Sequence, residues 1–564
     1  MSKRILILMI CILMTTNAAV LYAKQFPKMT PIPSIKLTPD TFEPYFKPTL
    51  PLDDTLNVRI NSDESGQIQN EQQICINPTN PDNVVAVWRD FRLGYRRIGV
   101  GHSFDGGLTW SDDLFPNSNN SWMSDPGLTY DVDGNFYALS LTFDAGGDYS
   151  GFEIFTSTDG GVIWSEPVQA LYTPTSDIFE DKELIACDRT PDSPYQGNMY
   201  IAWTRFTYQP EYSTDCCVIR TIDGNQTWEE PIYISEEPGL QWPVPVVGAG
   251  GVVYVAWVGF SFSTITLDRS FDGGATWDAD IPVAYVAAPY VELNGGIATF
   301  SYPAMDADIS GGQYHGNLYM AYMDWSNYDF DLYFRKSYDQ GYEWTPAVRI
   351  NDDEWDNGCD QFHPWLTVDE NGVISVMFYD RRNDPVDNLL YDIYMTQSFD
   401  AGDTWTPNLR ITTVSSDPTS GGVILAGLIG EYSGIAVRDG VANLVWTDFR
   451  LGDQDAFGSR VHTYTESSID DGTPAMPVKP LLVSNYPNPF NASTSIRISI
   501  PYKTDLNIAA YDMTGRKVAE IANSRFEAGT HTINWSPDGL SSGIYFVRLK
   551  SPSGSVARKV VLLK

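Results

Sequence analysis

The stretch SFDGGLTW, at Ser103–Trp110, decides the fold because the chain writes it six times. The other copies are STDGGVIW from residue 157, TIDGNQTW from 221, SFDGGATW from 270, SYDQGYEW from 337 and SFDAGDTW from 398. In each copy the Asp can accept hydrogen bonds from backbone N–H groups of its own turn, and Gly or Asn at the fifth position tolerates a positive φ. We therefore interpret the box as a turn between two strands that the Trp packs in place. The aspartates with this structural role are Asp105, Asp159, Asp223, Asp272, Asp339 and Asp400.

A second repeat is an apolar strand that ends in an aromatic residue. Its seven copies read VAVWRDFR at 85–92, ALSLTF at 138–143, YIAWTRF at 200–206, YVAWVGF at 254–260, YMAYMDW at 319–325, SVMFYDRR at 375–382 and NLVWTDFR at 443–450. Neighbouring copies lie 53 to 68 residues apart. A period near sixty with several short strands per unit is typical of a β-propeller with four-stranded blades.

The seventh copy lacks a box and a following strand, and the missing strand is found at the other end of the chain. NVRIN at 57–61 matches AVRIN at 347–351, which follows the fifth box. We expect this N-terminal strand to complete the last blade, because closing the ring removes exposed sheet edges. The prediction is an all-β fold, with a seven-bladed propeller over residues 55–465 and six blades as the alternative.

With six copies at blade spacing, the box S-x-D-x-G-x-x-W is similar to the Asp-box, or BNR repeat, of the sialidase superfamily. The resemblance implies three arginines on a sugar carboxylate, an Asp acid/base and a Tyr nucleophile activated by Glu. It also implies an F/Y-R-I-P stretch near the first blade. Here that strand reads NEQQICINP, without Arg, which argues against the sialidase mechanism in its strict form.

Residues 481–564 form a separate unit. Alternating apolar and polar residues with Gly turns predict a small C-terminal β-sandwich. Tyr486-Pro487-Asn488-Pro489-Phe490, Gly515-Arg516, Ala528-Gly529 and Ser542-Gly543-Ile544-Tyr545 resemble the C-terminal sorting domain (Por secretion, type A) of the type IX secretion system. The resemblance implies the type IX machinery as a partner and delivery to the outer cell surface or the medium.

The remaining segments fit an exported protein. Residues 1–24 are predicted to be a signal peptide, 25–54 a Pro-rich linker and 466–480 a second linker, with no transmembrane segment in the mature chain. The formal charge is −36; residues 481–564 hold ten Lys/Arg and five Asp/Glu, so the rest carries −41, the difference between −36 and +5. Such a surface repels nucleic acid, and we expect no nucleic-acid partner.

The Cys residues do not form a disulfide framework, and we expect neither a metal site nor a cofactor. Five of the six Cys follow residue 24, and no pair has metal-ligand spacing. Ca²⁺ is the alternative for the runs DVDGN at 131–135 and DENG at 369–372, which fit hairpin turns better.

Candidate site residues lie in loops that follow the apolar strand in units one, six and seven, which become neighbours when the ring closes. The candidate catalytic acids are Asp90, Asp380 and Asp448, and the candidate substrate-binding residues are Arg92, Arg382 and Arg450. Arg grips a carboxylate with two parallel hydrogen bonds, so the set suits an anionic sugar. In the alternative interpretation, each Asp–Arg pair ties its own hairpin in place.

Further candidates precede other units. Glu431 and Tyr432 are candidate catalytic residues; they point apart on an extended segment, so each would pair with a residue of another blade. Asp181-Lys182-Glu183 and His363 are expected to line the channel.

Three functions remain open. The first is a secreted or surface propeller that recognises a glycan or glycoprotein without sialidase turnover. The second is an exo-acting glycoside hydrolase of sialidase type. The third is a structural or adhesion propeller.

Overall fold

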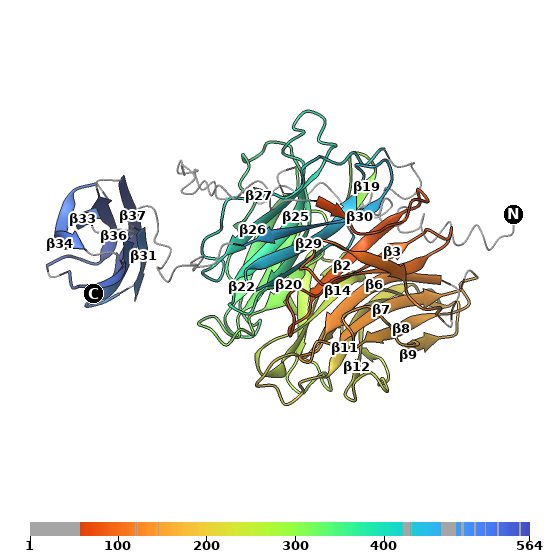
Figure 1. The fold of residues 1–564 in the computed structure, drawn as a ribbon. Helices are drawn as coiled ribbons and strands as arrows, with labels where there is room; N and C mark the ends of the chain where they lie inside the picture. Colours follow the sequence, from red (N-terminus) through yellow and green to blue (C-terminus); the bar gives the residue numbers. More distant parts are fainter. Residues whose placement is uncertain are drawn as a thin grey trace. The chain divides into compact units, whose positions relative to one another are not determined.

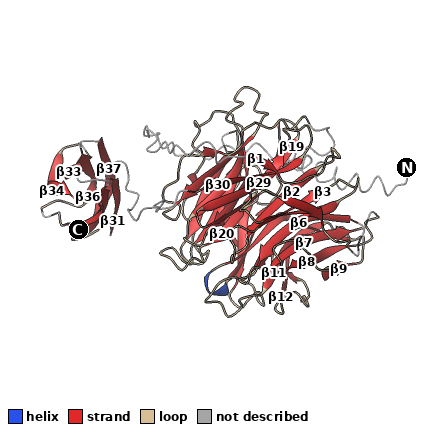
Figure 2. Ribbon diagram, viewed as in Figure 1, coloured by secondary structure: helices blue, strands red, loops and turns tan. Residues whose placement is uncertain are grey.

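The computed structural model describes residues 57–463, apart from 119, 121, 145, 327, 421–428 and 430, and residues 481–563, apart from 487–489, 501–503, 514, 527–528, 538 and 552–553. The chain divides into two compact units, Met1–Thr463 and Tyr464–Lys564. The predicted signal peptide and both predicted linkers lie outside the described residues. Among the described residues the regular structure is almost entirely strand, with one short 3₁₀ turn at Ala249–Gly251, so the all-β prediction is confirmed (Figure 2).

The described residues of the first unit form seven four-stranded antiparallel sheets in chain order. Sheet one consists of β2 (Gln69–Ile76), β3 (Val84–Asp90), β4 (Arg97–Ser103) and β5 (Ser111–Leu114). Sheet two consists of β6 (Trp122–Tyr130), β7 (Phe136–Phe143), β8 (Ser150–Ser157) and β9 (Val168–Thr173). Sheet three consists of β10 (Ile178–Cys187), β11 (Met199–Thr207), β12 (Ser213–Thr221) and β13 (Ile232–Tyr233). Sheet four consists of β14 (Leu240–Val247), β15 (Val253–Gly259), β16 (Thr264–Ser270) and β17 (Ile281–Tyr285). Sheet five consists of β20 (Ala304–Ala307), β21 (Leu318–Asp324), β22 (Asp331–Ser337) and β23 (Val348–Arg349). Sheet six consists of β24 (Gln361–Val368), β25 (Ile374–Asp380), β26 (Asp392–Ser398) and β27 (Leu409–Arg410). Sheet seven consists of β28 (Gly434–Arg438), β29 (Val441–Asp448), β30 (Asp455–His462) and β1 (Asn57–Arg59). A separate hairpin, β18 (Tyr290–Leu293) and β19 (Ile297–Phe300), is inserted between sheets four and five.

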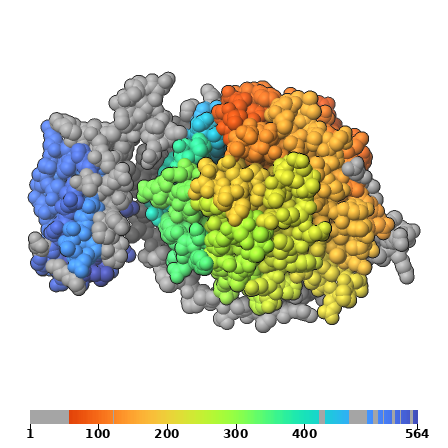
Figure 3. Space-filling view, turned by 90° about the horizontal axis from the view of Figure 1, so that it is seen from below, coloured from red at the N-terminus to blue at the C-terminus, as the bar shows by residue number. Residues whose placement is uncertain are grey.

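The sheets are arranged in a ring. The first strand of each sheet contacts the first strand of the next, in the order β2, β6, β10, β14, β20, β24 and β28, and β28 contacts β2 again. Figure 1 labels four of these strands, β2, β6, β14 and β20, near the middle of the first unit. In the space-filling view the colours pass in chain order from orange through yellow to green across neighbouring sheets (Figure 3). A closed ring of sheets around their first strands is the architecture of a β-propeller.

The ring is closed by the two ends of the first unit. β1 pairs with β30 in antiparallel register, Asn57 opposite Ser459 and Arg59 opposite Phe457. The next residue, Ile60, donates its N–H to the carbonyl of Ala456 at 2.8 Å and packs in the same buried cluster as Trp88. The sequence match between 57–61 and 347–351 predicted this pairing, and the register confirms it.

Each repeated box forms the turn between the third and fourth strands of its sheet. In the first box, Asp105 accepts the N–H groups of Leu108 and Thr109 at 3.0 and 2.9 Å, and Ser103 Oγ donates to its carboxylate at 2.7 Å. The Trp110 indole donates to the carbonyl of Gly107 at 3.1 Å. Gly107 has φ +93°, and its counterpart Asn225 has φ +69°, which explains why Asn is the one substitute at the fifth position.

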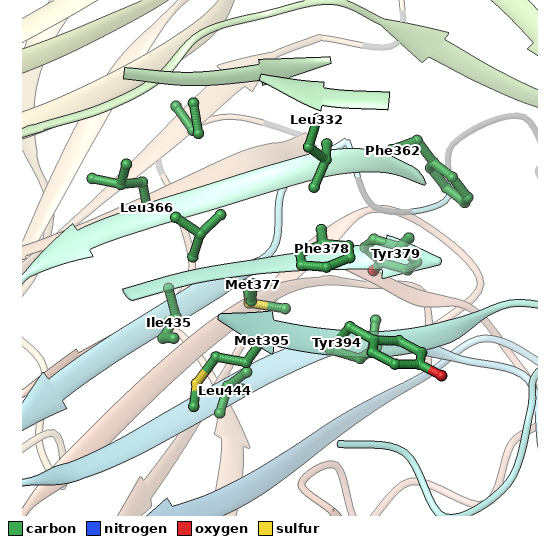
Figure 4. Packing of buried hydrophobic residues seen from close by; sticks show 14 of the residues in the cluster. Leu332, Phe362, Leu366, Met377, Phe378, Tyr379, Tyr394, Met395, Ile435 and Leu444 are labelled. Atoms are coloured by element: carbon green, nitrogen blue, oxygen red, sulfur yellow. The ribbon is translucent and has the colours of Figure 1, made fainter. Parts of the chain in front are cut away.

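Apolar side chains fill the space between neighbouring sheets. The largest cluster spans sheets five, six and seven, where Leu332, Phe378 and Leu444 come from three different sheets (Figure 4). Because the strands are buried on both faces, their sequences read as nearly continuous apolar runs.

The second unit contains two sheets. Their strands are β31 (Leu481–Tyr486), β32 (Thr494–Ile500) and β35 (Gly529–Trp535), and β34 (Lys517–Phe526), β33 (Thr504–Asp512), β36 (Gly543–Ser551) and β37 (Gly554–Leu562). Ile498 of the first sheet and Leu506 and Val547 of the second belong to one buried cluster. Phe490 is 2% exposed, whereas Pro487, Asn488, Pro489 and Ala528 of the predicted sorting motifs lie outside the described residues.

Removing the buried side chain that follows β1 should destabilise the ring. Ile60→Ala deletes apolar contacts from a 2% exposed position, so we expect a loss of about 2–5 kcal/mol in the free energy of unfolding. Urea unfolding followed by tryptophan fluorescence measures it, with Val414→Ala at a 51% exposed position as the control. Equal stability of the two variants would show that this segment does not close the ring.

Candidate functional site

The first strands of five sheets share one irregularity. In β2, β6, β10, β14 and β24 the pairing with the second strand shifts register near the start of the strand. Each shift contains a non-glycine residue with positive φ; these are Glu71 (59°), Asp125 (47°), Lys182 (57°), Trp242 (61°) and His363 (47°). Such conformations cost about 1–3 kcal/mol each and concentrate at functional sites. The centre of the ring is therefore the candidate site.

The bulges lie at one face of the ring. Asn70 at the first bulge pairs with Arg89 near the end of β3, and Asp181 at the third pairs with Thr204 near the end of β11. In antiparallel sheets this places the bulges beside the loops that join second and third strands. We call this the loop face; the boxes, which join third and fourth strands, define the opposite box face.

Lys182 is the centre of a charged cluster. Its Nζ lies 2.7 Å from Asp125 Oδ2, 2.9 Å from Glu431 Oε2 and 3.9 Å from Glu71 Oε1. Glu71 Oε1 also lies 2.7 Å from Arg89 Nη1. All five side chains are buried. Taking such ions out of water costs several kcal/mol each, so the cluster is stable only while its members stay paired.

The surroundings move the protonation equilibria of the cluster in opposite directions. Burial raises the pKa of Glu71 to about 8, although Arg89 acts against it. Burial alone would raise the pKa of Asp125, but the charges of Lys182 and Arg89 outweigh it and lower that pKa to about 2. Burial would lower the pKa of Lys182, yet Asp125 and Glu431 hold it well above its usual value. At neutral pH the cluster therefore holds a protonated and an ionised carboxyl group side by side.

Aromatic rings surround the lysine. Its Nζ lies 5.1 Å from the ring centre of Trp242 and 5.5 Å from that of Tyr432, within reach of cation–π attraction. Beside them is a cavity of only about 10 Å³, room for about one water-sized group. Its lining residues are Lys182, Leu184, Trp242, Pro243, Val244, Tyr302, Trp365, Glu431 and Tyr432. Phe300 of the inserted hairpin packs on Trp242, with ring centres 4.4 Å apart.

Several buried polar atoms here lack a hydrogen-bond partner within the described part of the chain. They are the Trp242 indole nitrogen, the Tyr432 hydroxyl and both carboxylate oxygens of Glu183. Burial raises the pKa of Glu183 well above its usual value, with Asp125 and Asp181 adding to the effect. Because an unsatisfied buried polar group costs about 1–3 kcal/mol, such a set indicates a place where a polar ligand can bind.

The rim of the loop face carries exposed apolar side chains. Six of the seven loops between second and third strands contribute at least one; these side chains are Leu93, Tyr95, Tyr212, Phe262, Tyr328, Val386 and Leu451. Four of the seven side chains are aromatic, and aromatic rings offer a flat surface on which a sugar ring can stack.

The predicted Asp–Arg residues form three separate pairs. These are Arg92 with Asp90, Arg382 with Asp380 and Arg450 with Asp448, at 2.8, 2.7 and 2.7 Å. Trp88 and Trp446 also donate their indole N–H to Asp90 and Asp448, both at 2.8 Å. Within residues 57–463 as described, no ion pair joins one of these three loops to another. Each of the three aspartates is the last residue of its strand and is fully buried.

Glu431 and Tyr432, in contrast, both reach Lys182 of another sheet. Glu71, Asp125 and Trp242 were not among the candidates from sequence. A signal was present: the dipeptides Asp125-Pro126, Trp242-Pro243 and His363-Pro364 recur at the same position of the first strand. Proline cannot donate to the strand ladder, so its recurrence inside a strand marks a bulge.

The described residues contain no group of three or more His, Cys, Asp or Glu side chains arranged to hold a metal ion. No helix in the same residues is long and apolar enough to cross a membrane.

The class of the second unit is defined by comparison with known families. Residues 484–563 match the secretion system C-terminal sorting domain. This unit directs the chain through type IX secretion to the cell surface or the medium.

No curated protein matches the chain. Among solved structures, a protein of unknown function from Dyadobacter fermentans DSM 18053 is 15% identical, with 57% of this chain and 93% of that chain covered and a TM-score of 0.38. The Hadza microbial sialidase Hz136 is 14% identical, with 68% and 75% covered and a TM-score of 0.39. The family GH93 α-L-arabinofuranosidase of Fusarium graminearum, solved with arabinobiose, is 12% identical, with 72% and 97% covered and a TM-score of 0.42.

The stability of the protein should fall as the pH rises toward 8. Between pH 4.5, the ordinary pKa of the glutamate, and about 8, folded Glu71 keeps a proton that the unfolded chain releases, so unfolding becomes easier as pH rises. Glu71→Gln removes this titration. We expect its Tm to decline less than that of the wild type between pH 5 and pH 8.

Calorimetry at both pH values measures the difference, with Glu211→Gln at an exposed position as the control. An unchanged decline in Glu71→Gln would mean that Glu71 does not hold this proton.

Proposed function

We propose that the chain is a cell-surface or secreted protein that recognises a glycan at the loop face of a seven-bladed propeller. Each of the seven four-stranded sheets is one blade, and the repeated boxes are Asp-boxes. Residues 1–24 act as the signal peptide, and the two sheets of the second unit form a β-sandwich. The sorting domain supports the location, and the ring of sheets supports the blade count.

The charged cluster with its unpaired polar neighbours carries the functional proposal. A sugar offers hydroxyl groups that both donate and accept. Carboxylates of Asp125 and Glu431 accept such bonds, and the Lys182 ammonium and the Trp242 indole donate them. A water-sized cavity admits one such group, while partly exposed Trp365 at its edge offers an apolar surface. Apolar walls with a few convergent polar groups are typical of ligand sites.

Glycan contact is assigned to Lys182, Glu431 and Tyr432, and a positioning role to the three Asp–Arg pairs. Arg92, Arg382 and Arg450 each already form an ion pair with the Asp two residues earlier, so a sugar carboxylate would have to compete with a buried ion pair at each position.

Tyr432→Phe should weaken glycan binding without changing stability. The hydroxyl has no hydrogen-bond partner among the described residues, so its removal leaves the fold unaffected and costs only the bond to the ligand. We expect a three- to tenfold higher Kd, about 0.5–1.5 kcal/mol, and an unchanged Tm. Screening the full chain on an oligosaccharide array, followed by calorimetry with the oligosaccharide that binds best, measures the change in Kd.

Tyr195→Phe, next to a box on the other face, is the matched control and should bind like the wild type. If no oligosaccharide on the array binds the wild type, the proposal fails.

Hydrolysis is a second candidate, favoured by the opposite pKa shifts of Glu71 and Asp125. A protonated acid next to an ionised one is what glycoside hydrolysis requires. Glu71 would donate its proton to the leaving oxygen, and Asp125 would accept a proton from the attacking water. Both are almost fully buried, so turnover requires the loop face to open.

A screen of the full chain on fluorogenic glycosides, including a sialoside and an arabinofuranoside, tests this candidate. We expect any hydrolysis to fall at least 100-fold in both Glu71→Gln and Asp125→Asn, and to persist in Asp90→Asn if the loop pairs only position the site. Activity that survives both cluster variants would rule out this pair as acid and base.

A further inference from the structure

Three junctions between neighbouring blades share one arrangement at the box face. In three sheets the residue just before the box is a cation, and it donates to the carbonyl of the fourth residue of the next sheet's box. The pairs are Arg220 with Gly273, Arg269 with Gln340 at 2.6 Å and Lys336 with Ala401 at 2.7 Å. Each cation also has a carboxylate partner, in order Glu229 at 2.9 Å, Asp278 at 3.0 Å and Asp403 at 2.7 Å.

A tyrosine stands opposite each of these cations. Arg220 pairs across the sheet with Tyr200, Arg269 with Tyr254 and Lys336 with Tyr319. The ring of each tyrosine is buried at the junction. Each of the three junctions therefore combines a filled interior with a neutralised cation.

The seam where sheet seven meets sheet one also has a cation at this place, but with different partners. Arg460 has the same place on the third strand of sheet seven, but its cross-strand partner is Asn443 instead of a tyrosine. The Arg460 guanidinium lies 3.0 Å from His462 Nε2, and no carboxylate of the described residues pairs with it. Arg460 Nε and Asn443 Nδ2 are buried without a hydrogen-bond partner in the same residues, and Asn443 is only 3% exposed.

The small asparagine leaves a cavity of about 140 Å³. Its lining residues are Ile76, Pro81, Asp82, Gly106, Arg438, Asp439, Val441, Asn443 and Arg460. Arg438 likewise forms no ion pair with a described carboxylate, whereas Asp82 and Asp439 are exposed at the rim. Arg438 and Arg460 thus line one cavity without an ion pair to a carboxylate of the described residues, in a chain whose formal charge is −36.

We propose that this seam cavity binds a small oxyanion, such as phosphate, sulfate or a carboxylate, between Arg438, Arg460 and Asn443. The anion takes the place of the carboxylate that neutralises the cation at three other junctions. Guanidinium groups match the geometry of an oxyanion and bind it through charge-assisted hydrogen bonds. Because the lining residues come from both sheet seven and sheet one, the bound anion holds the seam of the ring together.

Thermal unfolding of the full chain in sodium phosphate, with ionic strength matched by sodium chloride, tests the site. We expect a saturable rise in Tm of about 1–3 °C at millimolar phosphate, because a ligand that binds only the folded protein stabilises it. Asn443→Tyr rebuilds the side chain of the other junctions and fills the cavity. Its Tm in chloride should equal or exceed that of the wild type, and the phosphate response should vanish.

Arg460→Met provides a second variant should the tyrosine not fit, and it too should lose the response. Arg516→Met, at an exposed arginine of the second unit, should keep it. The same thermal unfolding measurements in sulfate and in acetate show which oxyanion binds best. A wild type without a saturable rise in any of the three anions, or a rise that persists in Arg460→Met, would overturn the proposal.

Discussion

The pairing of β1 with β30 is the interaction on which the first unit depends. A ring of sheets is stable only if its last sheet contacts the first, and in the described residues the fourth strand of sheet seven is β1, from the other end of the unit. Without β1 the edge of β30 would expose unpaired backbone groups, and the cluster around Ile60 and Trp88 would open to water. The other junctions are formed by neighbours in the chain, so the seam is the one place where closure needs both ends.

At the centre of the ring, strain and charge support one another. Lys182 takes a conformation that its residue type disfavours, and so do Glu71 and Asp125. The bulges bring these side chains close to Lys182. The ion pair between Lys182 and Asp125, and the proton that Glu71 keeps at neutral pH, make the burial of the two carboxyl groups tolerable. An unpaired buried charge costs several kcal/mol, and a bulge residue with positive φ costs about 1–3 kcal/mol, so the ion pair offsets part of the strain. The inserted hairpin adds an apolar cover through Phe300 on Trp242.

The fold could be predicted from the sequence because its determinants are local and repeated. The side-chain hydrogen bonds within the first box join residues two to four positions apart, and the apolar strand recurs seven times. The candidate site is different. Lys182 and Glu431 are 249 residues apart, and no local sequence pattern around either residue predicts their contact. The Asp–Arg pairs recur in three loops, which made them site candidates from sequence. Their recurrence reflects a local bond between an Asp and the Arg two residues later.

Closure by both ends also sets the order of folding. Arg59 and its partner Asp455 are 396 residues apart, so nearly the entire unit must be synthesised before the ring can form. Contacts between such distant residues carry a large entropic cost of loop closure and tend to form late. Until then β30 remains an open template for other chains. A nascent or truncated chain that ends before β30 can assemble sheets one to six but has no route to a closed ring, which makes completion of the last strands the committing step for this protein.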